Sequence, residues 1–441
     1  MKNVKIALIS LGCAKNLVNS EQMLCLLDEA GYEIVEDYEG ADVGIVNTCG
    51  FIDGAKMEAI ENILRLAEAK KEGLLKKIIV TGCLSQRYQH ELTDEMPEID
   101  GILGVGSYGS IVEAVESVME SDTLYERFDD KDAPVEEFGR IVSTGPAWAY
   151  IRIAEGCDNR CSYCAIPDIR GHFRSREMDA VVSEAEALAE SGVKELIVVA
   201  QDITRYGTDL YGHRCLAELL RKLCRIEGLE WIRLHYLYPD EIDEDLIDTI
   251  AEEEKILKYL DLPIQHINDT VLRLMNRRGT GEEIRALFTK LREKIPGLVL
   301  RTSLIAGLPG EGEAAFEELC EFLREYRLER AGVFAYSPEE GTRAAEMDRP
   351  DEETAERRAE LLNDIQAEIM DDFDESRMGS EEKVLCCGWD EEEMCWWGRS
   401  FAESPDIDGR ILFSAGDVQP GDFVTIRIID RIEEELYGEQ I

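Results

Sequence analysis

The sequence predicts an α/β protein with three parts: an N-terminal domain on a parallel, Rossmann-like sheet, a central partial barrel of six βα units, and a small C-terminal antiparallel β-barrel. The chain has 441 residues, and at about 150 residues per domain this length corresponds to roughly three domains. Up to about residue 376, short apolar runs alternate with helical patterns, which is typical of parallel sheets with crossover helices. After residue 376 the pattern changes to short β-rich runs between turns, which favours a small barrel.

The charge of the chain indicates the kind of partner. It has 94 acidic and 48 basic residues, a formal net charge of −46. Nucleic-acid affinity comes largely from Lys and Arg side chains that displace counterions, so an acidic chain repels phosphate backbones. It attracts a basic partner. We therefore expect a basic protein rather than RNA as the partner, although a high charge would also serve solubility alone.

The sequence contains no apolar run long enough to span a bilayer. The first apolar run, residues 6–11, is too short for a signal-peptide core. We therefore expect a cytoplasmic protein with no membrane contact. In that compartment the 13 cysteines are expected to be metal ligands, catalysts or buried filler rather than disulfides.

The N-terminal domain, residues 1–120, repeats a strand–helix unit. Strands are predicted at 5–10, 42–47 and 77–81, and helices at 20–30, 55–70 and 85–92. A small-residue turn with one cysteine follows each strand: Cys13, Cys49 and Cys83. Because ligands bind beyond the carboxyl ends of parallel strands, these cysteines are expected to converge there. Each is also expected just before a helix N-terminus, where the dipole favours the thiolate.

Three thiolates at one sheet edge suit an iron–sulfur cluster with one open iron. Two alternatives stay open. The cysteines could be small buried residues in strand-end turns, or they could hold zinc with a fourth ligand from elsewhere.

Residues 121–146 are predicted as a linker, and residues 147–375 as the central domain. Its strands are predicted at 149–154, 195–200, 231–237, 259–263, 299–305 and 331–336. Its helices are predicted at 180–191, 215–226, 243–254, 281–294 and 313–326. Six βα units are fewer than a closed eight-unit barrel needs, so we expect a partial barrel with its site at the carboxyl ends of the strands.

A loop after the first central strand carries Cys157, Cys161 and Cys164, separated by three and two residues. A loop with this spacing can bind three corners of a cubane cluster and leave the fourth iron free. Zinc would require a fourth ligand, for which His172 is the nearest candidate.

The C-terminal part, residues 376–441, has β-rich runs at 383–388, 393–400, 411–414 and 423–429. They predict a five-stranded antiparallel barrel. The segment holds 16 acidic and 6 basic residues, whereas an RNA-binding barrel should present a basic face. The acidic run 390–393, followed by Trp396 and Trp397, suggests a loop that could hold an Arg- and Lys-rich protein. A solvated hairpin with core tryptophans is the alternative.

The C-x3-C-x2-C loop, with Tyr163 before its last cysteine, resembles the radical S-adenosylmethionine (SAM) superfamily. Over nearly the whole chain, further motifs resemble the methylthiotransferases, and some resemble their RimO branch. The family motifs are 10–16, 47–52, 81–84 and 262–266, and the branch motifs are Lys15-Asn16, 87–92, 336–342 and 436–439.

This resemblance implies a methylthio transfer to the β-carbon of an aspartate in the small-subunit ribosomal protein S-twelve. It implies two [4Fe–4S] clusters, one on Cys157, Cys161 and Cys164 that binds SAM and one on the N-terminal cysteines that holds sulfur. It also implies an electron donor, a sulfur donor and a TRAM fold for residues 376–441. The tRNA-modifying branch shares the catalytic apparatus and is the alternative function.

Candidate SAM contacts lie near the ends of the central strands. Gln201 follows the second strand and Gln265 the fourth, while Arg301 lies on the fifth and Glu311 ends the turn after it. Arg301 could pair with the SAM carboxylate. A polar network inside the barrel is the alternative role.

Overall fold

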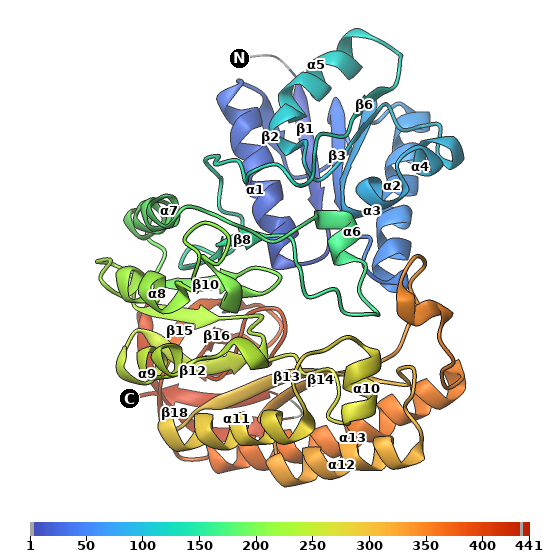
Figure 1. Cartoon of the computed structure of the whole chain (residues 1–441). Coiled ribbons are helices and arrows are strands. Elements are labelled where there is room, and N and C mark those ends of the chain that lie inside the picture. The colour runs from blue at the N-terminus through green and yellow to red at the C-terminus, as the bar shows by residue number, and fades with distance from the viewer. Residues whose placement is uncertain (1–3, 433–434) are drawn as a thin grey trace. The chain divides into compact units, whose positions relative to one another are not determined.

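The computed structural model describes residues 4–432 and 435–441 (Figure 1). Its N-terminal part contains a parallel six-stranded sheet in the order β2-β1-β3-β4-β5-β6. Its strands are β1 (Lys5–Ser10), β2 (Glu33–Val35), β3 (Val43–Thr48), β4 (Lys77–Gly82), β5 (Gly101–Leu103) and β6 (Tyr125–Arg127). The three predicted strands are confirmed. The other three have only three residues each, too few to show a periodicity. One of them, β6, lies within the predicted linker and pairs with β5 at the sheet edge.

Helices pack on both faces of this sheet because successive strand residues point to opposite sides. They are α1 (Ala14–Glu29), α2 (Asp53–Glu72), α3 (Cys83–Tyr88), α4 (His90–Glu95) and α5 (Ile111–Glu120). Ile78 and Val80 of β4 share an apolar cluster with α2, whereas Ile79 shares another with α1 and α5. The helix predicted at 85–92 is divided at Gln89, where φ is +42°.

The central sheet is also parallel and is open, in the order β14-β13-β12-β11-β10-β7. Its strands are β7 (Trp148–Arg152), β10 (Glu195–Val199), β11 (Trp231–Leu234), β12 (Ile256–Asp261), β13 (Val299–Ala306) and β14 (Arg330–Ala335). The main helices are α7 (Met178–Glu190), α8 (Leu216–Cys224), α9 (Glu244–Glu252), α11 (Gly281–Lys294) and α12 (Glu313–Tyr326). Short α10 (Asp269–Leu274) precedes α11. The six predicted βα units and the partial barrel are thus confirmed.

The helix α13 (Glu352–Ser376) is the longest in the described chain and was not predicted, because the βα alternation ends at β14. Its buried residues Ala355, Ala359, Leu362 and Ile369 recur at helical spacing. None of the helices within residues 4–432 and 435–441 combines the length and apolarity that crossing a membrane requires.

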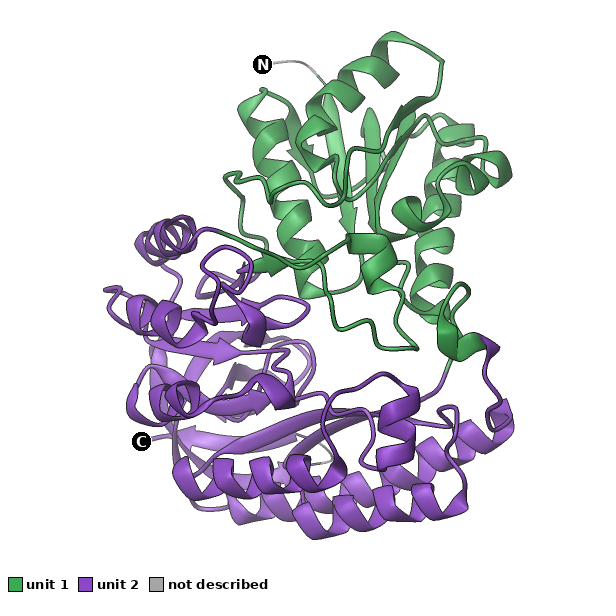
Figure 2. Cartoon of the chain, in the orientation of Figure 1, with its two compact units in different colours: residues 1–143, 154–176, 337–345 green, residues 144–153, 177–336, 346–441 purple. Residues whose placement is uncertain are grey.

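The chain forms two compact units (Figure 2). The first comprises residues 1–143, 154–176 and 337–345, and the second comprises residues 144–153, 177–336 and 346–441. The segment 154–176 contains the antiparallel pair β8 (Ala154–Glu155) and β9 (Arg174–Ser175), and α6 (Ile166–Arg170). The C-x3-C-x2-C loop therefore belongs to the same unit as the N-terminal sheet.

The C-terminal strands form a closed five-stranded barrel in the order β15-β16-β17-β19-β18, as predicted. They are β15 (Glu381–Asp390), β16 (Cys395–Arg399), β17 (Ile411–Ser414), β18 (Phe423–Ile432) and β19 (Glu435–Gln440). The expectation of a wholly antiparallel barrel is wrong for one pair: β17 and β19 are parallel, because closing the barrel in this order places two strands of the same direction side by side. Trp396 packs against the barrel core, whereas Trp389 is exposed.

Candidate functional site

Three interlocking turns carry Cys13, Cys49 and Cys83. A Cβ added to Gly12 would lie 2.7 Å from the Cβ of Cys49 and 3.0 Å from its Sγ. A Cβ added to Gly50 would lie 3.0 Å from the carbonyl carbon of Cys83. Glycine is therefore needed for this close approach of the backbones. The structure brings the three cysteines to one edge of the sheet, as the position of each after a strand predicts.

Buried amides hold these turns in place. The Nδ2 of Asn16 donates to the carbonyl of Leu11 at 2.7 Å, and the Nδ2 of Asn47 donates to the carbonyl of Asn16 at 2.9 Å. Gly82 has φ +99°, and a Cβ there would lie 2.5 Å from Asn47 Oδ1 and from the carbonyl oxygen of Thr48. Side-chain amides thus add hydrogen bonds to the backbone pairing where the strands end.

Arg170, on α6, reaches this edge and is only 1% exposed. Its Nε donates to Cys83 Sγ at 3.3 Å, and its Nη2 donates to Asn16 Oδ1 at 3.0 Å. Its Nη1 donates to Asn19 Oδ1 at 3.1 Å and to Glu155 Oε2 at 3.0 Å. Sequence reasoning missed Arg170, because its partners are distant in the chain and no spacing marks it.

Burial determines the direction of the pKa shift for two of the three thiols. It raises the pKa of Cys49 to about 11 and also raises the pKa of Cys83, although Arg170 attracts both thiolates. For Cys13 burial acts in the same direction, but nearby Lys15 and Arg170 outweigh it and lower the pKa. At Cys83, the first residue of α3, the net pKa is therefore raised in spite of the expected gain from a helix N-terminus. Cys49 does not adjoin a helix at all, since α2 begins only at Asp53.

The loop with Cys157, Cys161 and Cys164 is closed by backbone bonds. The amide of Cys157 donates to the carbonyl of Gly171 at 3.1 Å, and the amide of Cys164 donates to that of Cys161 at 3.0 Å. His172, the candidate for a zinc ligand, lies on the surface with its Nδ1 2.9 Å from Asp158 Oδ1. All six predicted cluster cysteines thus lie in the first unit.

The segment after this loop packs against Cys83. Ala165 and Ile169 of α6 form a buried cluster with Cys83, and Val105 packs against them. The two cysteine-bearing segments are therefore in direct contact within one unit.

The donor set of each triad fits an iron–sulfur cluster. None of the 13 cysteines, all of which lie in the described part of the chain, forms a disulfide, and thiolates are the usual ligands of such clusters. Within the described part of the chain, no three His, Cys, Asp or Glu side chains are gathered closely enough to share one metal ion. A cubane distributes three ligands over three iron atoms, so it needs a wider spacing than a single ion does.

The four candidate SAM contacts lie in the second unit. Gln201 follows β10 and is half-buried, and Gln265 follows β12 with φ +69°. Arg301 Nη1 donates to Asp261 Oδ1 at 2.8 Å. Glu311 is 3% exposed, and its Oε1 accepts from Arg358 Nη1 at 2.8 Å. Arg301 and Glu311 therefore have partners within the chain, and their contact with SAM stays a prediction.

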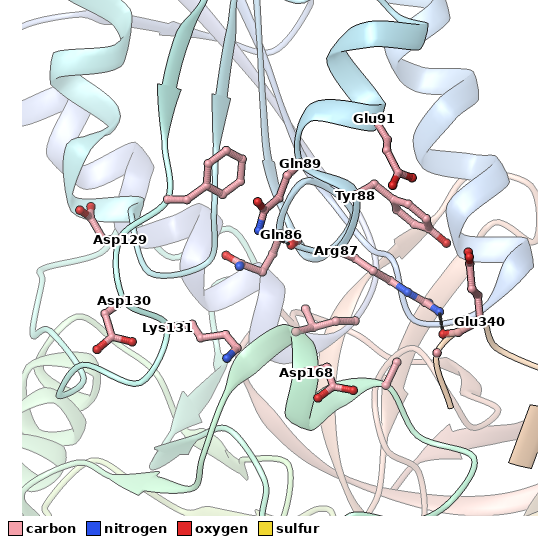
Figure 3. Close-up of a pocket in the computed structure, with 14 residues that line it drawn as sticks. Gln86, Arg87, Tyr88, Gln89, Glu91, Asp129, Asp130, Lys131, Asp168 and Glu340 are labelled. Carbon is pink, nitrogen blue, oxygen red and sulfur yellow. Dashed lines mark hydrogen bonds between the residues drawn. The ribbon is translucent and has the colours of Figure 1, made fainter. Parts of the chain in front are cut away.

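A cleft of about 750 Å³ is lined by α3, α6 and residues 128–131 and 340–341 (Figure 3). Arg87 Nη2 donates to the carbonyl of Glu340 at 2.7 Å, so it joins the motif 87–92 to the motif 336–342. Carboxylates of Glu91, Asp130 and Asp168 line the cleft, which gives it an acidic character. The wall formed by α3 begins at Cys83, and the wall formed by α6 follows the C-x3-C-x2-C loop in the chain.

Three protein families match successive parts of the chain. They are the uncharacterized protein family UPF0004 over residues 5–104, the radical SAM superfamily over residues 151–323 and the TRAM domain over residues 378–441. The radical SAM superfamily implies SAM and a [4Fe–4S] cluster. The TRAM match confirms the predicted identity of the C-terminal barrel.

Solved structures share the fold. The radical SAM methyltransferase TsrM from Kitasatospora setae, with cobalamin and a [4Fe–4S] cluster bound, is 16% identical with a TM-score of 0.56, covering 77% of each chain. The cobalamin-dependent SAM radical enzyme OxsB, with aqua-cobalamin and SAM bound, is 12% identical with a TM-score of 0.52, covering 84% of this chain and 56% of OxsB. At these identities the likeness concerns the fold alone.

Curated relatives match over the full length. The ribosomal protein uS12 methylthiotransferase RimO of Acetivibrio thermocellus is 47% identical, covering 99% of this chain and 98% of the relative. RimO of Pelotomaculum thermopropionicum is 49% identical and covers 99% of each chain. With this identity, and with the three domain families in the expected order, the chain belongs to the RimO family of radical SAM methylthiotransferases.

Proposed function

We propose that the chain is a radical SAM enzyme that transfers a methylthio group to the β-carbon of an aspartate in ribosomal protein uS12. The observation that carries the proposal is the gathering of both cysteine triads in one compact unit, in a chain that resembles RimO proteins over its full length. A β-C–H bond of aspartate has no useful acidity, so a general base cannot activate it and a radical route is required.

Two [4Fe–4S] clusters would be held by separate triads. Cys157, Cys161 and Cys164 would hold the SAM-binding cluster, and the N-terminal triad, Cys13, Cys49 and Cys83, would hold the second. When bound, the first cluster and SAM supply a 5′-deoxyadenosyl radical, and the second supplies sulfur at an open iron. The chain needs an electron donor and a sulfur donor for this chemistry.

The chain's own residues bind and orient these groups. The glycine turns bring the backbone close to the N-terminal thiols, and Arg170 holds Cys83 from α6. Gln201, Gln265, Arg301 and Glu311 are proposed to contact SAM. The bond from Arg301 to Asp261 uses Nη1 alone, so other N–H groups of its guanidinium could serve a direct contact.

A basic ribosomal protein suits the electrostatics. The net charge of −46 and the carboxylates along the cleft attract Lys- and Arg-rich segments. The tRNA alternative is not favoured, because the RimO relatives are named for uS12 and a net charge of −46 repels the RNA backbone. Modification of a ribosomal protein agrees with the expected cytoplasmic location.

The domain boundaries follow from the same proposal. We propose residues 1–120 as the methylthiotransferase domain, 121–146 as a connection whose strand β6 joins the N-terminal sheet, 147–375 as the radical SAM domain and 376–441 as the TRAM barrel. In three dimensions the loop 154–176 joins the first of these domains.

The experiment is anaerobic reconstitution with iron and sulfide, then incubation with SAM, a reductant and a peptide from the aspartate-bearing loop of uS12. Mass spectrometry should show one methylthio group in place of one hydrogen on the aspartate. A tRNA substrate is tested in parallel. Modified tRNA nucleosides with an unmodified peptide would overturn the proposal.

A further inference from the structure

We infer that Arg170 is a positioning residue of the N-terminal cluster, which tunes its reduction potential through Cys83 and fixes the geometry of the three cysteine turns. The inference rests on the proposed function, since it requires a cluster on Cys13, Cys49 and Cys83.

The guanidinium of Arg170 is buried, so its five N–H donors all need partners, and the identity of those partners is informative. A buried arginine is neutralised by one carboxylate, and Glu155 Oε2 provides it at 3.0 Å. Arg170 nevertheless donates to three more acceptors: Asn16 Oδ1, Asn19 Oδ1 and Cys83 Sγ. The acceptors are a proposed cluster ligand and two amide side chains of α1, the helix that follows Cys13. The donors of Arg170 are therefore satisfied by the residues around the cysteine turns.

The contacts reach all three turns. Nε of Arg170 donates directly to the sulfur of Cys83. Asn16, which accepts from Arg170, donates from Nδ2 to the carbonyl of Leu11 at 2.7 Å, next to the first turn. The same Nδ2 lies 3.3 Å from the carbonyl oxygen of Asn47, near the end of the strand that precedes the second turn. One guanidinium thus connects the residues that set the relative positions of the three cysteines.

The position of Arg170 in the chain links this edge to the other triad. It ends α6, the helix that follows the C-x3-C-x2-C loop. Ala165 and Ile169 of the same helix pack on Cys83. The N-terminal thiols are therefore held by the segment that carries the other three cysteines.

A hydrogen bond to a ligand sulfur withdraws negative charge from an iron–sulfur cluster, and such bonds are one of the factors that set its potential. Cys83 is buried, so the N–H of Arg170 acts without competition from water. Arg170 therefore favours the reduced cluster, and its removal should lower the midpoint potential.

The test isolates the N-terminal cluster by replacing Cys157, Cys161 and Cys164 with Ala. In this background we compare Arg170→Gln, Arg170→Lys, and Arg170→Gln combined with Glu155→Gln, which leaves no unpaired buried carboxylate. Arg127→Gln is the control. It removes a positive charge of the same unit whose partners are Glu113 and Asp129. The readouts are iron content, the EPR-monitored midpoint potential and the melting temperature of the metal-free chain.

We expect both variants that contain Arg170→Gln to shift the reduction equilibrium at least tenfold toward the oxidised cluster. For a one-electron couple this lowers the midpoint potential by at least about 59 mV. Arg170→Lys should restore part of the shift, and Arg127→Gln should cause none. Loss of iron from a double variant that melts like the parent would support the positioning role.

An unchanged potential in the iron-loaded double variant would overturn the inference. A double variant whose metal-free chain is unfolded would also overturn it, because the role of Arg170 would then be general stability. Failure of the parent chain to load a cluster would instead overturn the proposed function.

Discussion

Replacement of Gly82 by Ala should prevent the cysteine turns from closing. Gly82 has φ +99° and ψ −155°, a region that is essentially restricted to glycine and costs other residues about 1–3 kcal/mol. The added Cβ would lie 2.5 Å from Asn47 Oδ1 and from the carbonyl oxygen of Thr48. Such overpacking costs a further ~1–3 kcal/mol. The expected destabilisation is therefore about 2–6 kcal/mol.

The assay is thermal unfolding of the metal-free, reduced chain, followed by circular dichroism. For a unit of this size each 1 kcal/mol shifts the melting temperature by about 2–4 °C, so the transition of the first unit should fall by at least about 4 °C. Gly54→Ala is the matched control. Among the described residues, no atom beyond the neighbouring turns of α2 lies within 4 Å of a Cβ at Gly54, the second residue of that helix, so alanine there should cause no loss of stability. Equal melting of the two variants would refute the geometric argument.

The remaining predictions concern the clusters, a buried carboxylate and a helix cap. Cys161→Ala should abolish SAM cleavage, whereas Cys49→Ala should spare cleavage and stop sulfur transfer; full methylthio product from the Cys49 variant would contradict this division of roles. The pKa of Glu403 is lowered to about 2 because Arg377 and Arg330 outweigh its burial, so its stabilising effect is complete above pH 4.5 and is lost as pH falls toward 2. The loss is on the order of 3 kcal/mol, and acid titration of unfolding should show it in the parent but not in Glu403→Gln. Thr280 caps α11 by accepting from the amide of Glu283, so Thr280→Ala should cost about 0.5–2 kcal/mol in chemical denaturation; no loss would show that the cap is replaced by solvent.

The strands could be predicted where burial makes their sequence continuously apolar. Every residue of β3 is buried, and so is every residue of β7, β10 and β11, whereas β13 and β14 are only partly buried. The strands β2, β5 and β6 have three residues each, and their pairing depends on neighbours that local sequence does not contain. The parallel β17–β19 pair is likewise set by barrel closure rather than by the residues of either strand.

The positions of the N-terminal cysteines were predictable because parallel strands bring their carboxyl ends to one edge. The thiol pKa values were not, since the helix-dipole argument ignores burial, which dominates at Cys49. Arg170 was also beyond prediction. Its partners come from residues 16, 19, 83 and 155, and only the folded chain brings them together.

The central claim is that two separate triads of thiolates each hold one cluster. Iron and sulfide analysis of the anaerobically reconstituted chain tests it most directly. With four irons in each [4Fe–4S] cluster, the parent should bind about eight iron atoms, and a chain with either triad replaced by Ala should bind about four. Four iron atoms in the parent, or none after the loss of only one triad, would contradict the account.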